Sequence, residues 1–381
     1  VQTCALPISN STAEQLWKFM ETDLTEAITS GKLTSKTSLE DRDGGTRATL
    51  EAARCLLGKI YLYQEKYADA KSELEKVISS GKYDLIADVS TFYHPASAGC
   101  KEYVLECVRH YDPSNMYSQE GWFGILANWG FGYGFIAGPE ASMHYKFNTT
   151  SGYSYFNPSK SLYDAFVAEE GADGYRLNAW IRTWEQVIAM NIAVNTTTNK
   201  YASEGYFRLK WLASTDDEFV GYWCGNQSNT PVIRYADVLL MAAEACLQAG
   251  DQAGADEYLG RVRDRARLPR KSHVTLSDIK LERRLELAME GMRFQDLKRW
   301  GDAPAVLADK GKKLPTFQIV PDPNNDLTTA AGIYNARYTT KTTYVDNEKS
   351  LAGWTPNRDE WLPFPENELE VNSNLKQNPG Y

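Results

Sequence analysis

The chain has 381 residues, of which 43% are hydrophobic and 24% charged, a balance typical of a globular protein with a substantial core. Its formal net charge of -9 argues against a nucleic-acid partner, because an acidic surface repels phosphate backbones. No apolar run reaches the roughly 18 residues that a membrane-spanning helix needs, so we expect no helix that spans a membrane.

Helical periodicity dominates the first part of the chain. Residues 11–30 are predicted to form one amphipathic helix, with Ser11 and Glu14 as its capping box. A polar loop leads into a predicted helical hairpin over 46–85, and Gly81 ends it as a helix C-terminus prefers. The apolar stripe of the first helix consists of Leu16, Phe19, Met20, Leu24, Ala27 and Ile28.

A second hairpin is predicted over 231–269. When Gly58 is superposed on Ala243, both hairpins show tetratricopeptide spacing, with a small residue at the reference, Ala at +12, Leu at +16 and Val at +19. These positions are Ala70, Leu74 and Val77 in the first hairpin and Ala255, Leu259 and Val262 in the second. Each hairpin of such an array buries its face against a neighbour. One further helix, over 276–300, is predicted to follow the second hairpin.

The part between the hairpins has a different character. Its helical periodicity is weak, and only 159–168 and 176–190 are predicted to be helices. Long irregular segments in a folded chain are usually functional. Residues 302–381 are again expected to be loop-rich, because prolines at 304, 315, 321 and 323 break any helix.

We therefore predict a mainly α-helical fold: tetratricopeptide-like hairpins with a loop-rich, aromatic-rich subdomain inserted between them. The expected regions are 11–88, a truncated helical region, 89–230, the loop-rich subdomain, and 231–381, which holds the second hairpin, the further helix and a C-terminal wrap.

Aromatic residues gather in the loop-rich subdomain, where six of the ten tryptophans lie. Residues 121–135, "GWFGILANWGFGYGF", combine two Trp, four Phe or Tyr and five Gly. Flat Trp and Tyr rings suit the apolar C–H face of a sugar, and polar groups nearby can bind its hydroxyls. The candidate ligand-binding residues are Trp122, Trp129, Tyr133, Tyr153, Tyr155 and Trp223.

Other kinds of site are less well supported by the spacing. The four histidines stand in no metal-binding pattern, and "GYGFIA" over 132–137 lacks the strand and helix of a dinucleotide site. We expect no metal, no cofactor and no catalytic residue. Two alternatives stay open: a peptide-binding repeat scaffold, and a glycoside hydrolase, which would need two carboxylates flanking the bond. The available carboxylates are Glu120, Glu140, Asp164, Asp173 and Glu185.

Charged residues on the helices are interpreted as framework. In "ERRLELAMEGMRFQDLKRWG" over 282–301 we expect the i,i+3 pairs Arg283–Glu286, Glu290–Arg293 and Asp296–Arg299, with Leu285, Met289, Phe294, Leu297 and Trp300 on the buried side. In "RYADVLLMAAEA" we expect Arg234, Asp237 and Glu244 to tie the helix to neighbouring loops by charge-assisted hydrogen bonds.

The cysteines show no CxxC spacing. Cys55 and Cys246 fall on apolar helical faces and are expected to be buried thiols. Cys100 and Cys107 could pair if the loop between them folds back.

Five segments in the expected order resemble the SusD/RagB family of outer-membrane nutrient-binding lipoproteins, over about residues 12–381. They are "RATLEAARCLLGKIYLYQEKYADA", "NPSKSLYDAFVAEEGADGYRLNAWI" with Asp173-Gly174-x-Arg176, "PVIRYADVLLMAAEA", "ERRLELAMEGMRFQDLKRWG" and "LPFPENELEVNSNLKQNPGY".

The resemblance implies a non-catalytic protein on the extracellular face of the outer membrane. It would capture an oligosaccharide, or alternatively a peptide, and hand it to a SusC-like TonB-dependent transporter. Attachment would be through a lipid anchor that this sequence does not contain, since Cys4 follows only three residues and is not expected to be the lipidated one. The family's ligand residues vary with the ligand, so none is transferred to this chain.

Overall fold

The computed structural model describes residues 10–108, 157–189, 204–210 and 229–381, apart from 327, 330, 333, 334, 336 and 349–351, together with the backbone of two short strands at 135–136 and 193–194. The N-terminal part consists of α1 (Ala13–Thr29), the turn η1 (Asp43–Gly45), α2 (Leu50–Tyr63) and α3 (Tyr67–Ile78). Thr12 and Gln15 form the capping box of α1. The prediction of Ser11 and Glu14 was wrong by one residue, because the helix begins at Ala13.

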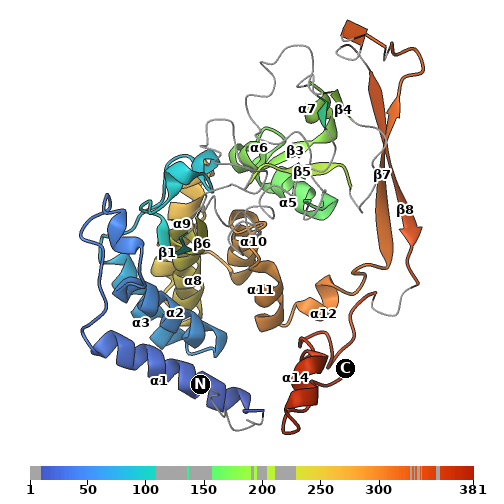
Figure 1. The fold of residues 1–381 in the computed structure, drawn as a ribbon. Coiled ribbons are helices and arrows are strands. Elements are labelled where there is room, and N and C mark those ends of the chain that lie inside the picture. The colour runs from blue at the N-terminus through green and yellow to red at the C-terminus, as the bar shows by residue number, and fades with distance from the viewer. Residues whose placement is uncertain are drawn as a thin grey trace, which may run out of the picture.

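Two helix pairs form the left side of the molecule in Figure 1: α2 with α3, and α8 (Tyr235–Gln248) with α9 (Gln252–Arg265). The superposition of Gly58 on Ala243 in the sequence predicted which residues of each pair are in contact. A Cβ atom at Gly58 would lie 2.8 Å from Cγ of Leu74, so this position must be a glycine for the two helices to pack so closely. The six residues at +12, +16 and +19, listed above, are all fully buried. This confirms the tetratricopeptide-like packing.

Replacing Leu74 with alanine is expected to lower the free energy of unfolding by about 2–5 kcal/mol, because the side chain is fully buried between α2 and α3. Leu16→Ala on α1 is the matched control, since Leu16 is 50% exposed, and should change stability by at most about 0.5 kcal/mol. Urea unfolding of both variants measures the difference. Equal losses would contradict the assignment of Leu74 to the repeat core.

The helix predicted over 276–300 is two helices, α10 (Leu276–Glu286) and α11 (Arg293–Arg299), followed by the short α12 (Ala303–Val306). The prediction of one continuous helix was wrong because the backbone turns to positive φ at Met289 (65°) and Gly291 (82°). Of the side chains expected to be buried, Leu285 and Leu297 are buried, whereas Met289 and Trp300 are half-buried and Phe294 is 38% exposed.

The loop-rich part contains the turns η2 (Val89–Thr91) and η3 (Pro95–Ser97) and the helices α5 (Lys160–Glu170), α6 (Tyr175–Trp180) and α7 (Trp184–Ala189). Three two-stranded antiparallel sheets join its segments: β1 (Tyr103–Cys107) with β6 (Thr230–Arg234), β2 (Phe135–Ile136) with β4 (Ala193–Val194), and β3 (Ile181–Thr183) with β5 (Tyr206–Arg208). The single helix predicted over 176–190 was wrong, since β3 separates α6 from α7 by pairing with β5.

The C-terminal region holds a long ribbon of β7 (Lys313–Pro321) and β8 (Tyr338–Asp346), which runs along the right of Figure 1, and the short helix α14 (Glu366–Val371). The expectation of loops throughout 302–381 missed this ribbon. Its prolines are compatible with pairing because both strands of a two-stranded sheet are edge strands. Asn10 and Lys376 exchange two hydrogen bonds, of 3.1 and 3.0 Å, so the described N-terminal end lies against the C-terminal wrap.

The described residues form two apolar cores under these elements. The larger is formed by α2, α3, α8 and α9, and the smaller by η2, α5, α6 and the end of α10. Cys55 and Cys246 are buried thiols, as expected. Cys100 and Cys107 are both free, so the alternative of a disulfide between them is not realised.

Candidate ligand-binding face

The six predicted ligand-binding residues, Trp122, Trp129, Tyr133, Tyr153, Tyr155 and Trp223, lie outside the described residues. What the structure does show is how the ends of their segments are held. These ends are residues 108 and 157, 189 and 204, and 210 and 229. We call the described elements that carry them, β1, β6, α5–α7 and the β3–β5 sheet, the loop-bearing face.

Strands β1 and β6 bring two of these ends together. Cys107 is in register with Thr230. Next to them the Glu106 carboxylate accepts a 2.9 Å hydrogen bond from the Asn229 amide and one of 2.8 Å from the backbone N–H of Gly99. Burial raises the pKa of Glu106, although these two donors oppose the shift. The start of the first segment, after residue 108, and the end of the last one, before residue 229, are therefore held at one place.

A buried cluster of charges lies beneath the loop-bearing face. At its centre the Glu286 carboxylate, at the end of α10, contacts Arg265 (2.5 Å), Arg234 (3.1 Å) and Arg176 (3.1 Å). We call this group, with its neighbours, the ion cluster; its members are Arg176, Arg234, Arg265 and Lys210 with Glu102, Glu282, Glu286 and Glu290.

Glu286 is held ionised by this arrangement. Its burial alone would raise the pKa, but Arg265, Arg234 and Arg176 outweigh burial and hold the pKa well below its usual range. The cluster draws its members from α6, β6, α9 and α10 and from the residues next to β1, β5 and α10, so it fixes the loop-bearing face onto the repeat helices. Glu102 of this cluster accepts from Arg234 at 2.6 Å and from Arg265 at 3.2 Å.

The expected i,i+3 pairs are correct for one case in three. Asp296 and Arg299 do pair, at 2.9 Å. Arg283 instead contacts Asp237 (2.8 Å) and Asp296 (2.9 Å), because both acids face it across the buried side of α10. The predictions of Arg283–Glu286 and Glu290–Arg293 were wrong, since both glutamates turn into the ion cluster.

The framework role expected for Arg234, Asp237 and Glu244 is confirmed. Arg234 joins the ion cluster and Asp237 binds Arg283. Glu244 accepts from Arg299 and, at 2.9 Å, from the Trp300 indole N–H. The expectation of loop partners was wrong for Asp237 and Glu244, because Arg283 lies on α10 and Arg299 on α11, and the pattern of one helix does not indicate which neighbour faces it.

Asp173-Gly174-x-Arg176 lies at the start of α6, and its arginine is fully buried. Arg176 binds Glu170 (2.7 Å), Glu282 (2.5 Å) and Glu286 (3.1 Å). Asp173 lines a surface cleft of about 380 Å³ with Arg267, whose guanidinium lies 3.7 Å from the centre of the Tyr175 ring. Arg176 thus belongs to the framework, and the cleft lies beside it, because Glu170 both lines the cleft and binds Arg176.

The carboxylates considered for glycoside hydrolysis are differently placed. Asp164 is exposed and binds Lys160 at 2.6 Å, and Glu185 accepts a long hydrogen bond of 3.4 Å from Thr340 on β8. In the cleft, Glu170 is occupied by Arg176, which leaves Asp173 as its other carboxylate. Glu120 and Glu140 lie outside the described residues.

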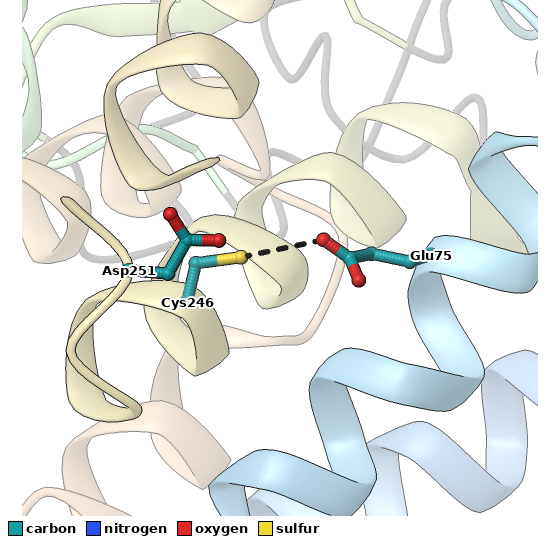
Figure 2. A group of neighbouring side chains, drawn as sticks. All are labelled: Glu75, Cys246 and Asp251. Atoms are coloured by element: carbon teal, nitrogen blue, oxygen red, sulfur yellow. Dashed lines mark hydrogen bonds between the residues drawn. The ribbon is translucent and has the colours of Figure 1, made fainter. Parts of the chain in front are cut away.

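Among the described residues, one group of side chains has the composition of a metal site. Figure 2 shows Glu75 on α3 facing Cys246 on α8, with Asp251 beside them at the start of α9. However, the ammonium of Lys71 already lies 2.6 Å from Asp251 and 3.9 Å from Glu75. Burial raises the pKa of the Cys246 thiol to about 12, so the thiolate that a metal needs is disfavoured. The group is best described as a contact between the two helix pairs.

A model of the SusD family matches residues 101–381. The chain belongs to the SusD family. Among its relatives, a SusD-like protein of Bacteroides ovatus is 31% identical over 170 residues, covering 40% of this chain and 29% of the relative. SusD-like protein P2 of Formosa agariphila is 26% identical over 362 residues, covering 86% of this chain and 59% of the relative. The chain therefore spans less than two thirds of either relative.

Solved structures with the same fold include a laminarin-binding SusD-like protein, with a TM-score of 0.72 and 27% identity over 97% of this chain and 70% of that one. A surface glycan-binding protein A of Bacteroides thetaiotaomicron, in complex with laminarihexaose, has a TM-score of 0.70 and 24% identity, with coverage of 97% and 72%. They confirm the SusD-family fold of tetratricopeptide-like helices expected from the sequence. Within the described part of the chain, no helix has both the length and the apolar character to cross a membrane.

Proposed function

We propose that this SusD-family protein binds an oligosaccharide at the cell surface without catalysis. The observation that supports this most directly is the loop-bearing face: three segments, containing Trp122, Trp129, Trp211 and Trp223, leave and re-enter a rigid framework held by buried ion pairs. Rigid elements that carry variable loops are the usual basis of a binding site. The laminarin-binding relative of the same fold supports a glycan ligand.

The proposed contact residues are Trp122, Trp129, Tyr133, Tyr153, Tyr155 and Trp223, which lie in the region 89–230 that we propose as the ligand-binding part. Their rings would stack on sugar faces, where each ring is a rigid partner with little conformational entropy to lose. The two segments that carry these residues meet the framework at β1–β6, where Cys107 is in register with Thr230, and β2 within the first segment pairs with β4. Both pairings support a shared binding surface.

Binding to laminarin tests this proposal. Retarded migration of the protein in a laminarin-containing native gel, together with a glycan array, is the measurement. Trp129→Ala and Trp122→Ala are each expected to weaken binding about 5- to 100-fold, which corresponds to losing a ring contact of about 1–3 kcal/mol. Trp361→Ala is the control, since Trp361 is 49% exposed and its ring lies beside Lys298 of α11, 5.6 Å from the ammonium.

Two results would contradict the proposal in different ways. An array without any bound glycan would favour the peptide alternative. Release of reducing sugar from laminarin by the purified protein would show a glycoside hydrolase, the second alternative, and overturn the non-catalytic assignment.

We further propose that the protein works with a SusC-like TonB-dependent transporter on the extracellular face of the outer membrane, where a lipid anchor would hold it. Membership of the SusD family supports both partner and place. Co-purification with an outer-membrane barrel from native membranes is the test, and isolation of the full-length protein free of any barrel would argue for a free-standing binder.

A further inference from the structure

The surface cleft beside Arg176 is lined by two segments of the chain. One runs from the end of α5 to Asn178 on α6 and includes Asp173, and the other is residues 266–268, directly after α9. The volume of the cleft, about 380 Å³, lies within the range of about 300–1,000 Å³ that is usual for small-molecule sites. All of its lining residues belong to the described part of the chain, so their polar groups can be followed one by one.

The Asp173 carboxylate is open to a ligand. Its side chain is exposed and forms no ion pair or hydrogen bond with any residue that the structure describes. The other carboxylate of the cleft, that of Glu170, is already occupied. It accepts from the Arg176 Nε at 2.7 Å and from the backbone N–H groups of Arg176 and Leu177, at 3.1 and 3.3 Å. A cation that enters the cleft therefore finds its counter-charge at Asp173.

The Arg267 guanidinium is held in the cleft without a counter-ion. It lies 3.7 Å from the centre of the Tyr175 ring, a separation at which two flat groups lie face to face. The Tyr175 hydroxyl is fixed in turn, because it accepts from the Val89 N–H at 3.1 Å and donates to the Asp88 carboxylate at 3.1 Å. Within the described residues no carboxylate forms an ion pair with Arg267. Its N–H groups are therefore free around the edge of a fixed plane.

The backbone of Arg267 has a conformation that a glycine adopts at lower cost. Its φ is +62°, in the left-handed region, at a helix end where glycine is the usual residue. The N–H groups of Arg267 and Leu268 donate to the carbonyls of Asp264 and Arg263, at 3.0 and 2.9 Å, which closes the end of α9. The chain thus keeps an arginine at a strained position and places its guanidinium in the cleft. Strain of this kind is concentrated at functional positions.

We propose that the cleft binds a small zwitterion, a molecule with a free ammonium and a free carboxylate: Asp173 binds the ammonium, and Arg267 binds the carboxylate. The observation that carries the proposal is two opposite charges on the two segments that line one cleft, with no ion pair between them. A guanidinium edge matches a carboxylate through two parallel hydrogen bonds. The Asn178 side-chain amide, which also has no partner among the described residues, can bind a polar group between the two charges.

Two other ligands fit the cleft less well. A neutral sugar is held best by stacking on an aromatic face, but Tyr175, the one aromatic side chain among the lining residues, has a face covered by Arg267. A calcium ion needs six to eight oxygen ligands, whereas Asp173 is the one open carboxylate of the cleft. The site goes beyond the proposed function, since none of its residues is a proposed glycan contact.

Isothermal titration calorimetry with alanyl-alanine tests the proposal. The N-acetylated, C-terminally amidated dipeptide, which lacks both charges, should bind at least about 10-fold more weakly. Asp173→Asn and Arg267→Gln should each weaken binding of alanyl-alanine by about 10-fold or more, because each removes one charged contact. Free alanine is the second ligand: tighter binding of alanine than of the dipeptide would indicate an amino acid, and the reverse a short peptide, and both results support a zwitterion site.

Arg270→Gln is the matched control. Arg270 is three residues from Arg267 but binds Glu257 and Asp264, both at 2.6 Å, and does not line the cleft. Its replacement should leave the affinity for alanyl-alanine unchanged.

Arg267→Gly separates binding from folding. Glycine adopts a φ of +62° without strain, so the melting temperature should stay close to the original while binding is lost as in Arg267→Gln. Equal binding of the free and blocked dipeptides, or no binding at about 10 mM of dipeptide or alanine, would overturn the proposal. Migration in laminarin should be the same for Arg267→Gly and the unmodified chain. Loss of laminarin binding in this variant would make the cleft a sugar site and overturn the zwitterion, whereas an unmodified chain that binds the dipeptide but no glycan would refute only the proposed function.

Discussion

Glu286→Gln is expected to lower the free energy of unfolding by about 3–5 kcal/mol, the typical result of removing one partner from a buried ion pair. The substitution keeps the shape of the side chain and removes its charge. Arg176, Arg234 and Arg265 would then share a fully buried site without the carboxylate that they surround. Since these residues come from α6, β6 and α9, the loss affects the attachment of the loop-bearing face as well as the repeat helices.

The control for this prediction is Glu257→Gln. Glu257 binds Arg270 at 2.6 Å, a distance similar to the 2.5 Å between Glu286 and Arg265. Both side chains of this control pair are about half exposed, at 54% and 45%. Exposed pairs contribute about 0–1 kcal/mol, so this variant should remain close to the original stability. Urea unfolding followed by far-UV circular dichroism measures both. A Glu286→Gln variant as stable as Glu257→Gln would mean that the ion cluster contributes little to the fold.

Phe317→Ala is expected to destabilise the protein by about 3–5 kcal/mol, the usual range for removing a buried phenylalanine ring. Phe317 on β7 is 4% exposed, and its ring packs against Trp184 on α7 with 5.6 Å between the ring centres. Trp184 in turn packs against Phe207 of β5 at 5.4 Å. These three rings attach the β7–β8 ribbon to the loop-bearing face.

Gly205 provides a second, coupled variant. Its φ is +87°, and a Cβ atom there would lie 2.5 Å from the Phe317 ring. Gly205→Ala therefore introduces both backbone strain and a clash, whereas in a Phe317→Ala background only the strain remains. We expect the double variant to be more stable than the sum of the single losses predicts. Strict additivity would contradict the contact, and Val345→Ala, at a site 59% exposed on the same ribbon, should change little.

Elements with a strong local period could be predicted from the sequence. The hairpins α2–α3 and α8–α9 follow from the positions of Gly58, Leu74 and Leu259, because helix packing depends on side chains one and two turns apart. The two places where a predicted helix is interrupted could not be predicted. The chain turns between α10 and α11, and β3 interrupts the helix predicted over 176–190, because Ile181–Thr183 pair with a strand more than 20 residues away.

The candidate site divides in the same way. Family membership could be recognised from motifs such as Asp173-Gly174-x-Arg176, and the comparison with known families confirms it. The roles of the motif residues could not be predicted. The sequence does not show whether a charged residue on a helix pairs with its i+3 neighbour or with a residue far away in the chain. Lys210 carries no signal in the sequence at all, because its burial depends on α6 and α10 together.

The sequence by itself determined the fold class, the repeat contacts and the family, because these depend on local periodicity and on short contiguous motifs. Only the tertiary structure decided which charges meet. Glu286 gathers three arginines from elements between 21 and 110 residues away, and Glu290 joins Lys210 to Arg234. The physical reason is that a buried charge is stable only beside its counter-charges, and which ones it meets depends on how the whole chain folds.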